Sequence, residues 1–171
     1  MQIEVTSDVF RLAQVFTISR GSRTEAKVLT VRITDGGVTG VGECVPYARY
    51  GETLESVTAQ IAGLSGVLTR EGLYDLLPAG AARNAVDCAL WDLEAKRSGT
   101  PVWQLAGLAP LKPEMTAYTL SLDTPENMRA QAAKNAFRPL LKIKLGTPDD
   151  MPRLEAVRAG APDSTIIVDA N

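Results

Sequence analysis

Strand-like and helix-like patterns alternate through the last third of this sequence, and this alternation constrains the fold more than any other feature. Apolar runs typical of strands cover Met115 to Leu120, Leu140 to Leu145 and Thr165 to Val168. Helical patterns separate them, one from Thr124-Pro125 to about Phe137 and one from Pro148 to Ala159. Thr124 suits a helix N-cap, and Pro125 suits the first helical position. Since alternating strands and helices form parallel strands joined by right-handed crossovers, we predict an α/β fold that contains the first strands of a TIM-type barrel.

Lys142 and Lys144 lie two residues apart on the second of these strands, so their side chains share one face. Two ammonium groups held together repel each other, which favours loss of a proton from one of them and can make a lysine a usable base. Asp169 follows the third apolar run and offers a carboxylate, the kind of oxygen ligand that Mg²⁺ prefers. Because strand ends carry the chemistry of parallel barrels, the lysines are candidate catalytic residues and Asp169 is a candidate metal ligand.

Each of these residues also has a structural interpretation. A Lys-x-Lys pair on a strand is most often a solvated edge, and an aspartate after a strand can cap the next helix. Thr119, at the end of the first barrel strand, is a candidate substrate contact, although threonine is common at strand ends. Asn171 either shapes a loop or holds the candidate metal ligand Asp169 in position without contacting the metal itself.

Amino-acid composition limits the classes of binding partner that we expect for this chain. The chain has 171 residues, with 18 basic and 20 acidic side chains and no long run of either sign. This balance gives no indication of a nucleic-acid or membrane surface, so a small molecule is the expected partner. No histidine is present, which excludes every imidazole-based mechanism. Two cysteines form no disulfide framework, and the first residues lack a signal-peptide pattern, so we expect a cytoplasmic location.

The first part of the chain is typical of an antiparallel meander followed by helices. Alternating patterns cover Ile3 to Ile18 and Lys27 to Ile33, and Asp35-Gly36-Gly37 turns the chain into a third strand. Two connections, Ser19 to Thr24 and Pro46 to Glu52, are expected to be loops beside the sheet. Helical patterning follows Thr53, a plausible N-cap, and prolines from 110 to 113 mark a boundary. We therefore predict a capping domain over residues 1–110 and an incomplete barrel domain over residues 111–171.

Five motifs in this order resemble the enolase superfamily. They are the loop Pro46 to Glu52, the segments Ala79-Gly80-Ala81-Ala82-Arg83-Asn84-Ala85 and Asp87-Cys88-Ala89-Leu90-Trp91-Asp92-Leu93, Lys142-Ile143-Lys144, and Asp169-Ala170-Asn171. The resemblance covers essentially the whole chain and is to the muconate-lactonizing branch. The loop Pro46 to Glu52 is most similar to that of the L-Ala-D/L-Glu dipeptide epimerases.

This resemblance implies a division of roles. Lys144 would be the base, Lys142 its electrostatic neighbour, and Asp169 the first of three acidic Mg²⁺ ligands. The other two acids and an opposing lysine would come from later strands and have no counterpart in residues 1–171. The chain is therefore expected to be an incomplete piece of an isomerase that epimerises a dipeptide through an enediolate. Association with a second copy or with the missing half of the barrel is expected as well.

Capping loops of the family contact the variable part of the substrate. By resemblance, the candidate substrate-binding residues in these loops are Arg20, Arg23, Thr24, Tyr47, Arg49 and Tyr50, although each could be an ordinary exposed loop residue. Other enolate-forming reactions of the superfamily would use the same lysines and metal ligand, namely racemisation of N-acylamino acids, o-succinylbenzoate synthesis and cycloisomerisation. A non-catalytic truncated module is the alternative from a different class.

Overall fold

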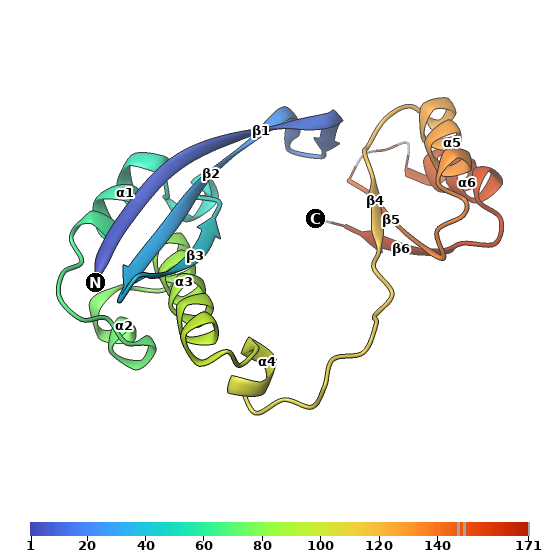
Figure 1. The fold of residues 1–171 in the computed structure, drawn as a ribbon. Coiled ribbons are helices and arrows are strands. Elements are labelled where there is room, and N and C mark those ends of the chain that lie inside the picture. Colours follow the sequence, from blue (N-terminus) through green and yellow to red (C-terminus); the bar gives the residue numbers. More distant parts are fainter. Residues whose placement is uncertain (147, 149, 171) are drawn as a thin grey trace. The chain divides into compact units, whose positions relative to one another are not determined.

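The computed structural model describes residues 1–146, 148 and 150–170, and it divides into two compact units. The first contains Met1–Phe10 and Ala26–Leu111, and the second contains Arg11–Glu25 and Lys112–Asn171. The tip of an N-terminal hairpin therefore clusters with the C-terminal residues (Figure 1). The division into domains 1–110 and 111–171 stays a prediction.

The first unit contains a three-stranded sheet in the order β1-β2-β3 (Figure 1). Its strands are β1 (Gln2–Ile18), β2 (Gly21–Asp35) and β3 (Val38–Cys44). The antiparallel register of β2 and β3 runs from Leu29↔Cys44 to Asp35↔Val38. Gly36 and Gly37 make the predicted turn with φ values of 58° and 81°, and two positive φ values are what a two-residue type I′ hairpin turn requires.

The predicted helical region contains four α-helices. They are α1 (Leu54–Ala62), α2 (Arg70–Leu76), α3 (Ala81–Ser98) and α4 (Val102–Leu105), and the 3₁₀ helix η1 (Ala48–Tyr50) precedes them. Thr53 is the N-cap of α1, as predicted, and forms a reciprocal capping box with Ser56. Within the described part of the chain, no helix combines the length and apolar content that a membrane crossing requires.

The contact between α3 and β3 is unusually close, and two glycines make it possible. A Cβ atom on Gly40 would lie 2.1 Å from the carbonyl oxygen of Ala89, and one on Gly42 would lie 2.0 Å from that of Ala85. The helix backbone therefore rests directly on the strand. Around this contact lies the core of the first unit, which includes Leu29, Val31, Ile33, Val57, Ile61, Leu73, Val86 and Leu93.

Parallel strands and two helices form the second unit, which confirms the predicted mixed α/β class. The sheet order is β4 (Tyr118–Leu120), β5 (Leu140–Lys144) and β6 (Thr165–Asp169), and α5 (Pro125–Lys134) and α6 (Asp150–Gly160) connect the strands. The helices cover one face of this sheet (Figure 1). Its core comprises Leu120, Leu122, Met128, Ala132, Leu141, Ile143, Val157 and Ala161.

The largest differences from the predicted boundaries occur at three elements, and the other boundaries differ by one or two residues. The first barrel strand begins at Tyr118 rather than Met115, because its pairing with β5 starts only at Leu141. Helix α5 ends at Lys134 rather than near Phe137, because Asn135 leaves helical geometry and donates a side-chain hydrogen bond to the Gln131 carbonyl. The loop predicted from Ser19 to Thr24 is also shorter, since β2 already begins at Gly21.

Candidate active site

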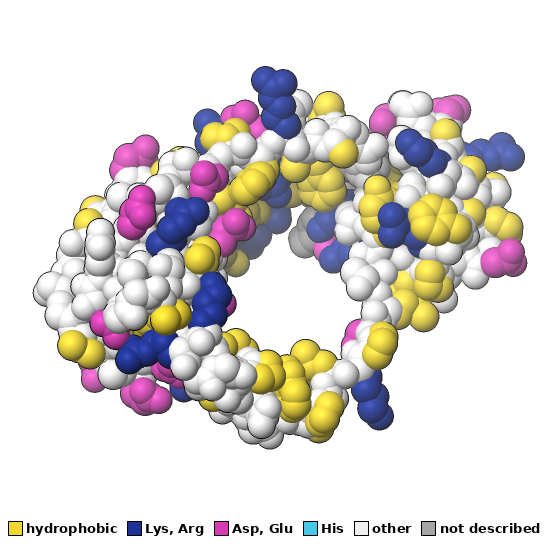
Figure 2. All heavy atoms as spheres, viewed as in Figure 1, with side chains coloured by type: hydrophobic (Ala, Val, Ile, Leu, Met, Phe, Trp, Pro, Cys, Tyr) yellow, Lys and Arg dark blue, Asp and Glu magenta, His cyan; other side chains and the backbone are white. Residues whose placement is uncertain are grey.

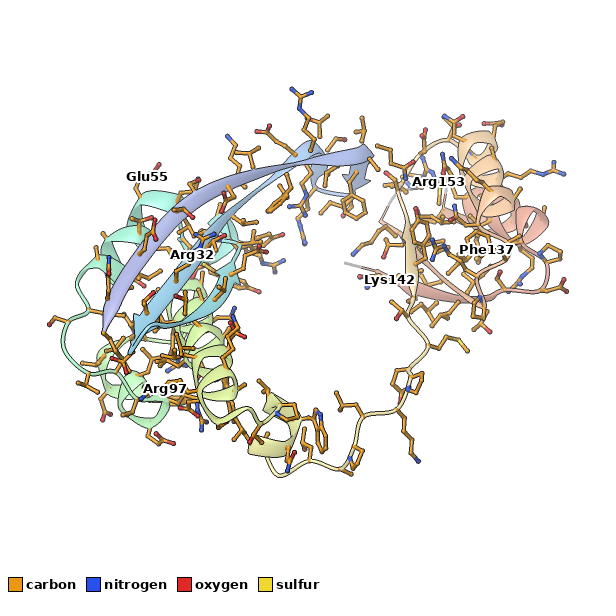
Figure 3. The ribbon with its side chains drawn as sticks, in the orientation of Figure 1. Arg32, Glu55, Arg97, Phe137, Lys142 and Arg153 are labelled. Carbon is orange, nitrogen blue, oxygen red and sulfur yellow. The ribbon has the colours of Figure 1, made fainter. Side chains whose placement is uncertain are left out.

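The two lysines of β5 lie on the face of the sheet opposite its helices. Leu141 and Ile143 are buried against α5 and α6, so the alternating residues Lys142 and Lys144 face the other way. Figure 3 shows Lys142 on the side away from the helices, whereas Phe137 and Arg153 lie on the helix side. Strand pleating therefore produces the shared face that the sequence predicted.

Asp169 joins the lysines through a single oxygen atom. Its Oδ2 lies 2.8 Å from Lys142 Nζ and 2.7 Å from Lys144 Nζ. The parallel register, which pairs Lys144 with Asp169, brings these side chains together at the carboxyl ends of β5 and β6. The Lys144 side chain is 16% exposed and that of Lys142 is 32% exposed, so Lys144 is the more enclosed amine.

Thr119 belongs to the same face. It is the register partner of Lys142 on β4, while its neighbours Tyr118 and Leu120 pair with the core-facing residues of β5. Its side chain is half-buried. Asn171, the other strand-end candidate, lies outside the described residues.

The tip of the β1–β2 hairpin lies against the ends of β4 and β5. The backbone N–H of Leu122 donates to the Thr17 carbonyl at 3.1 Å, and a Cβ atom on Gly146 would lie 3.0 Å from that of Ser19. Arg20 occupies the turn itself, whereas Arg23 and Thr24 lie on β2 rather than in a loop. All three are exposed, and the Arg23 guanidinium lies 5.9 Å from the centroid of the Phe16 ring.

Tyr47, Arg49 and Tyr50 form a separate group in the first unit. The rings of Tyr47 and Tyr50 are 5.7 Å apart, and Arg49 and Tyr50 are exposed. Glu52 holds this loop, because its carboxylate accepts hydrogen bonds from the backbone N–H of Tyr47 at 3.0 Å and of Ala81 at 2.6 Å. Ala81 begins α3, whose N-cap Gly80 has no side chain to cap it, so Glu52 supplies the missing acceptor.

The described residues supply only some of the ligands that a divalent cation needs. Asp169 offers a carboxylate at the strand ends, which is the ligand chemistry of Mg²⁺. Among residues 1–146, 148 and 150–170, no group of three histidine, cysteine, aspartate or glutamate side chains could hold a metal ion. Asp169 therefore fits one position of a Mg²⁺ site.

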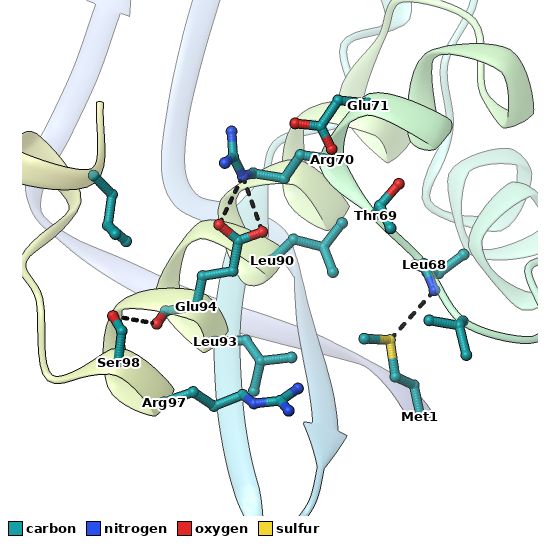
Figure 4. Close-up of a pocket in the computed structure, with 12 residues that line it drawn as sticks. Met1, Leu68, Thr69, Arg70, Glu71, Leu90, Leu93, Glu94, Arg97 and Ser98 are labelled. Carbon is teal, nitrogen blue, oxygen red and sulfur yellow. Dashed lines mark hydrogen bonds and ion pairs between the residues drawn. The ribbon is translucent and has the colours of Figure 1, made fainter. Parts of the chain in front are cut away.

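A further cavity of about 630 Å³ lies in the first unit and contains no predicted site residue (Figure 4). Leu90, Leu93 and Leu105 contribute apolar walls. Its charged residues are paired: Arg70 contacts Glu94 at 3.0 Å and stacks on Trp91, and Arg97 pairs with Asp35 outside the cavity. Arg70, Glu94 and Arg97 are thus all engaged in ion pairs.

Comparison with known proteins shows which family this chain belongs to. Residues 1–107 match the family described as "Mandelate racemase / muconate lactonizing enzyme, N-terminal domain". The chain belongs to this family. This membership confirms the predicted relationship to the enolase superfamily, and the antiparallel capping sheet followed by parallel strands is the expected arrangement for the N-terminal part of such a member.

Relatives of the chain within this family include isomerases of amino-acid derivatives. The L-Ala-D/L-Glu epimerase of Escherichia coli K12 is 45% identical and matches 99% of this chain and 54% of its own length. The N-acetyl-D-glutamate racemase of a Pseudoalteromonas species is 42% identical over 84% of this chain and 47% of its own. The chain thus spans about half the length of these relatives.

Solved structures match over the same range. An enolase family member from Agrobacterium tumefaciens with homology to dipeptide epimerases, solved with sodium and L-Ala-L-Glu, is 56% identical with a TM-score of 0.94. A dipeptide epimerase from Enterococcus faecalis, complexed with Mg and L-Leu-L-Tyr, is 30% identical with a TM-score of 0.87. Each comparison covers 99% of this chain and 53% of the other.

Sequence reasoning missed two features of the second unit and one of the first. The second unit has the single oxygen of Asp169 shared by both lysines and the contact of Ser121 with the hairpin tip. The first unit has the Glu52 cap of α3. The Gly80 position before a long helix was a signal that a cap had to come from elsewhere. No pattern in the sequence distinguishes Ser121 from other serines.

Proposed function

We propose that this chain forms part of a Mg²⁺-dependent epimerase acting on a dipeptide with an acidic second residue, of the L-Ala-D/L-Glu type. The observation that carries the proposal is the convergence of Lys142 and Lys144 on one oxygen of Asp169 at the carboxyl ends of parallel strands. The names of the relatives in Escherichia coli and Agrobacterium tumefaciens support the substrate class.

The difficulty of the reaction explains why these residues are needed. A hydrogen next to a carboxylate is very weakly acidic, and its removal places the bonding electrons on the substrate as an enediolate. A divalent cation held by Asp169 and further acids would stabilise this developing negative charge in a site with little water. The positive charge of Lys142 beside the site acts in the same direction.

Lys144 is the proposed base. Its neutral amine accepts the α-proton as the carbon–hydrogen bond breaks, and it becomes an ammonium group. Its low exposure keeps competing water away from the amine. Return of a proton to the opposite face of the enediolate inverts the stereocentre; the resemblance to the superfamily assigns this second proton to another lysine.

The hairpin tip is the proposed contact for the variable end of the dipeptide. Arg20 and Arg23 are exposed cations within the same unit as the strand ends, and a guanidinium binds a carboxylate through two parallel hydrogen bonds. An acidic second residue of the substrate would match this chemistry. Thr119 would contact the substrate from the face that it shares with Lys142.

The test is solvent exchange in the intact protein. With Mg²⁺ present, L-Ala-D-Glu and L-Ala-L-Glu in deuterium oxide should interconvert and take up deuterium at the glutamate α-carbon, followed by NMR. Interconversion without deuterium uptake, or no reaction with either epimer across a dipeptide panel, would contradict the proposal.

Racemisation of an N-acylamino acid is the second candidate. It is favoured by the 42% identity with the N-acetyl-D-glutamate racemase of a Pseudoalteromonas species. Both substrates place a glutamate α-proton between an amide and a carboxylate, so the lysine chemistry would be the same. Comparing kcat/KM for N-acetyl-glutamate and L-Ala-Glu decides between them.

A further inference from the structure

Ser121 makes an unusual double contact with the hairpin tip. Its Oγ accepts a hydrogen bond from the backbone N–H of Thr17 at 2.8 Å and donates one to the carbonyl of Val15 at 3.2 Å. One hydroxyl therefore satisfies two backbone groups on the edge of β1. An alanine at this position would leave both groups without this partner.

The position of the Ser121 hydroxyl follows from β4, the strand that carries Thr119. Leu120 and Leu122 are buried in the core of the second unit, so the alternation of side chains puts Ser121 on the same face as Thr119. The adjacent N–H of Leu122 adds a third hydrogen bond to the tip, at the carbonyl of Thr17. The attachment point of the hairpin is thus two residues from a predicted substrate contact.

The tip also lies close to the end of β5. Gly146, two residues after Lys144, approaches Ser19 so closely that a Cβ atom would lie 3.0 Å from the Ser19 Cβ. Within the tip, the hydroxyls of Thr17 and Ser22 hydrogen bond at 2.8 Å and link the two arms. The turn that carries Arg20 is therefore held against the ends of both strands.

We propose that Ser121 is a positioning residue that holds this hairpin tip over the strand ends, so that Arg20 and Arg23 meet the substrate. This inference rests on the proposed epimerase function for its consequence on substrate binding. Ser121 itself contacts neither substrate nor metal in this scheme. Its effect passes through the backbone of Val15 and Thr17.

The first measurement is limited trypsin digestion of the intact protein, because Arg20 and Arg23 are exposed cleavage sites within the tip. We expect cleavage to be faster when the tip leaves the strand ends, because the docked backbone is held by hydrogen bonds from Ser121 and Leu122. Ser121→Ala should increase the cleavage rate after these arginines roughly tenfold, as expected for the loss of two hydrogen bonds. Ser121→Thr keeps the hydroxyl and should cleave at the parent rate.

The second measurement separates positioning from general stability. Ser121→Ala should raise KM for L-Ala-D-Glu roughly tenfold while kcat at saturating substrate changes little, since Lys144 is untouched. The rise should be smaller for a dipeptide with an apolar second residue. Ser98→Ala is the matched control, because Ser98 Oγ donates to the Glu94 carbonyl within α3, which belongs to the other unit.

The outcomes are distinguishable. Unchanged cleavage in Ser121→Ala, or failure of Ser121→Thr to restore the parent rate, would overturn the anchoring role. Faster cleavage with an unchanged KM would overturn the positioning of Arg20 and Arg23. A parent protein that epimerises no dipeptide would refute the proposed function instead, while the digestion experiment would still decide whether Ser121 anchors the tip.

Discussion

Lys144 and Lys142 are chemically identical residues with different expected roles. Lys144→Ala should abolish exchange of the α-proton from one epimer of the substrate, because this variant loses the base on one face of the enediolate. Lys142→Ala should lower kcat for both epimers, because the variant lacks one positive charge beside the developing enediolate. Deuterium uptake by each epimer, followed by NMR, measures both effects.

Lys134→Ala provides the control for both lysine variants, because Lys134 is an exposed residue in the last turn of α5. It should leave exchange unchanged. Parent-rate exchange of both epimers by Lys144→Ala would show that another group is the base.

Asp169 is the proposed metal ligand and forms ion pairs with Lys142 and Lys144. Asp169→Asn removes the charge that Lys142 and Lys144 share, and it replaces an anionic metal ligand with a neutral amide. The Mg²⁺ concentration for half-maximal activity should rise by at least roughly tenfold, measured by metal titration of turnover. Asp163→Asn, at an exposed turn of the same unit, should leave it unchanged. An unaltered Mg²⁺ requirement in Asp169→Asn would remove this residue from the metal site.

The sequence predicted which side chains share a face but not which atoms meet. A two-residue spacing on a strand is sufficient to place Lys142 beside Lys144. The contact with Asp169 depends on the register between β5 and β6, and apolar strands of similar length are compatible with several registers. For the same reason, the partnership of Ser121 with Val15 and Thr17 could not be predicted, since these residues are far apart in sequence.

Among the elements, the contact of α3 with β3 gives a sharp stability prediction. Gly42→Ala places a methyl group where the Ala85 carbonyl lies, so helix and strand must separate. Overpacking of this kind costs about 1–3 kcal/mol and sometimes more, and a backbone obstacle belongs at the upper end. Urea unfolding of the variant measures the loss of free energy.

Gly63→Ala is the control for this experiment. Gly63 has right-handed helical geometry, and a Cβ atom there would meet its nearest neighbour at an ordinary 3.5 Å. This variant should match or slightly exceed the parent in stability. Equal stability of the two alanine variants would show that α3 can move away from β3 at little cost.

Asp92 clamps the same two elements in a pH-dependent way. Burial alone would raise the pKa of this carboxyl, but hydrogen bonds from Lys96 and from the Val41 backbone outweigh it and hold the pKa below its usual value of 3.8. A depressed pKa stabilises the fold above the unfolded pKa, and this contribution is lost as the pH falls through the folded pKa. Asp92→Asn should therefore lower stability at pH 7 and flatten its decrease below about pH 4.

Urea unfolding of the parent and Asp92→Asn at pH 7 and pH 3 tests this linkage, and Asp163→Asn serves as the control. An acid dependence identical in the parent and in Asp92→Asn would contradict the role of the clamp.

For the whole molecule, element order was easier to predict than the grouping of its parts. Periodicity identified β5 and the α3 stripe, because each buries an alternating or helical apolar face. Strand β6 was identified from its apolar run, although Ile167 and Val168 are exposed. The sequence predicted strands at Ile3 to Ile18 and Lys27 to Ile33 as neighbours in the capping meander, and the structure groups Arg11–Glu25 with the C-terminal unit. Polar side chains and backbone groups make that contact, and they leave no hydrophobic periodicity in the sequence.

A polypeptide made of residues 1–171 alone should bind Mg²⁺ weakly and should not epimerise dipeptides, since a single carboxylate competes poorly with water for this ion. It should also self-associate. Strand β6 is an edge of its sheet, and Ile167 and Val168 are 41% and 46% exposed on it. Hydrophobic side chains are likewise exposed along α4 and the segment after it, including Leu108 and Leu111 (Figure 2). Calorimetric titration and light scattering measure these properties; an active, monodisperse monomer would contradict the prediction.

The hairpin contact also has a consequence for the order in which the protein is made. Thr17 and Ser121 are 104 positions apart, so a ribosome must add more than a hundred residues before the tip has anything to bind. The turn at Gly36 and Gly37 can close β2 onto β3 much earlier, because it needs only neighbouring residues. The β1–β2 hairpin also needs only neighbouring residues, so during that interval its tip is still undocked. Closure of the proposed active site is therefore a late event in synthesis, after the capping sheet has formed.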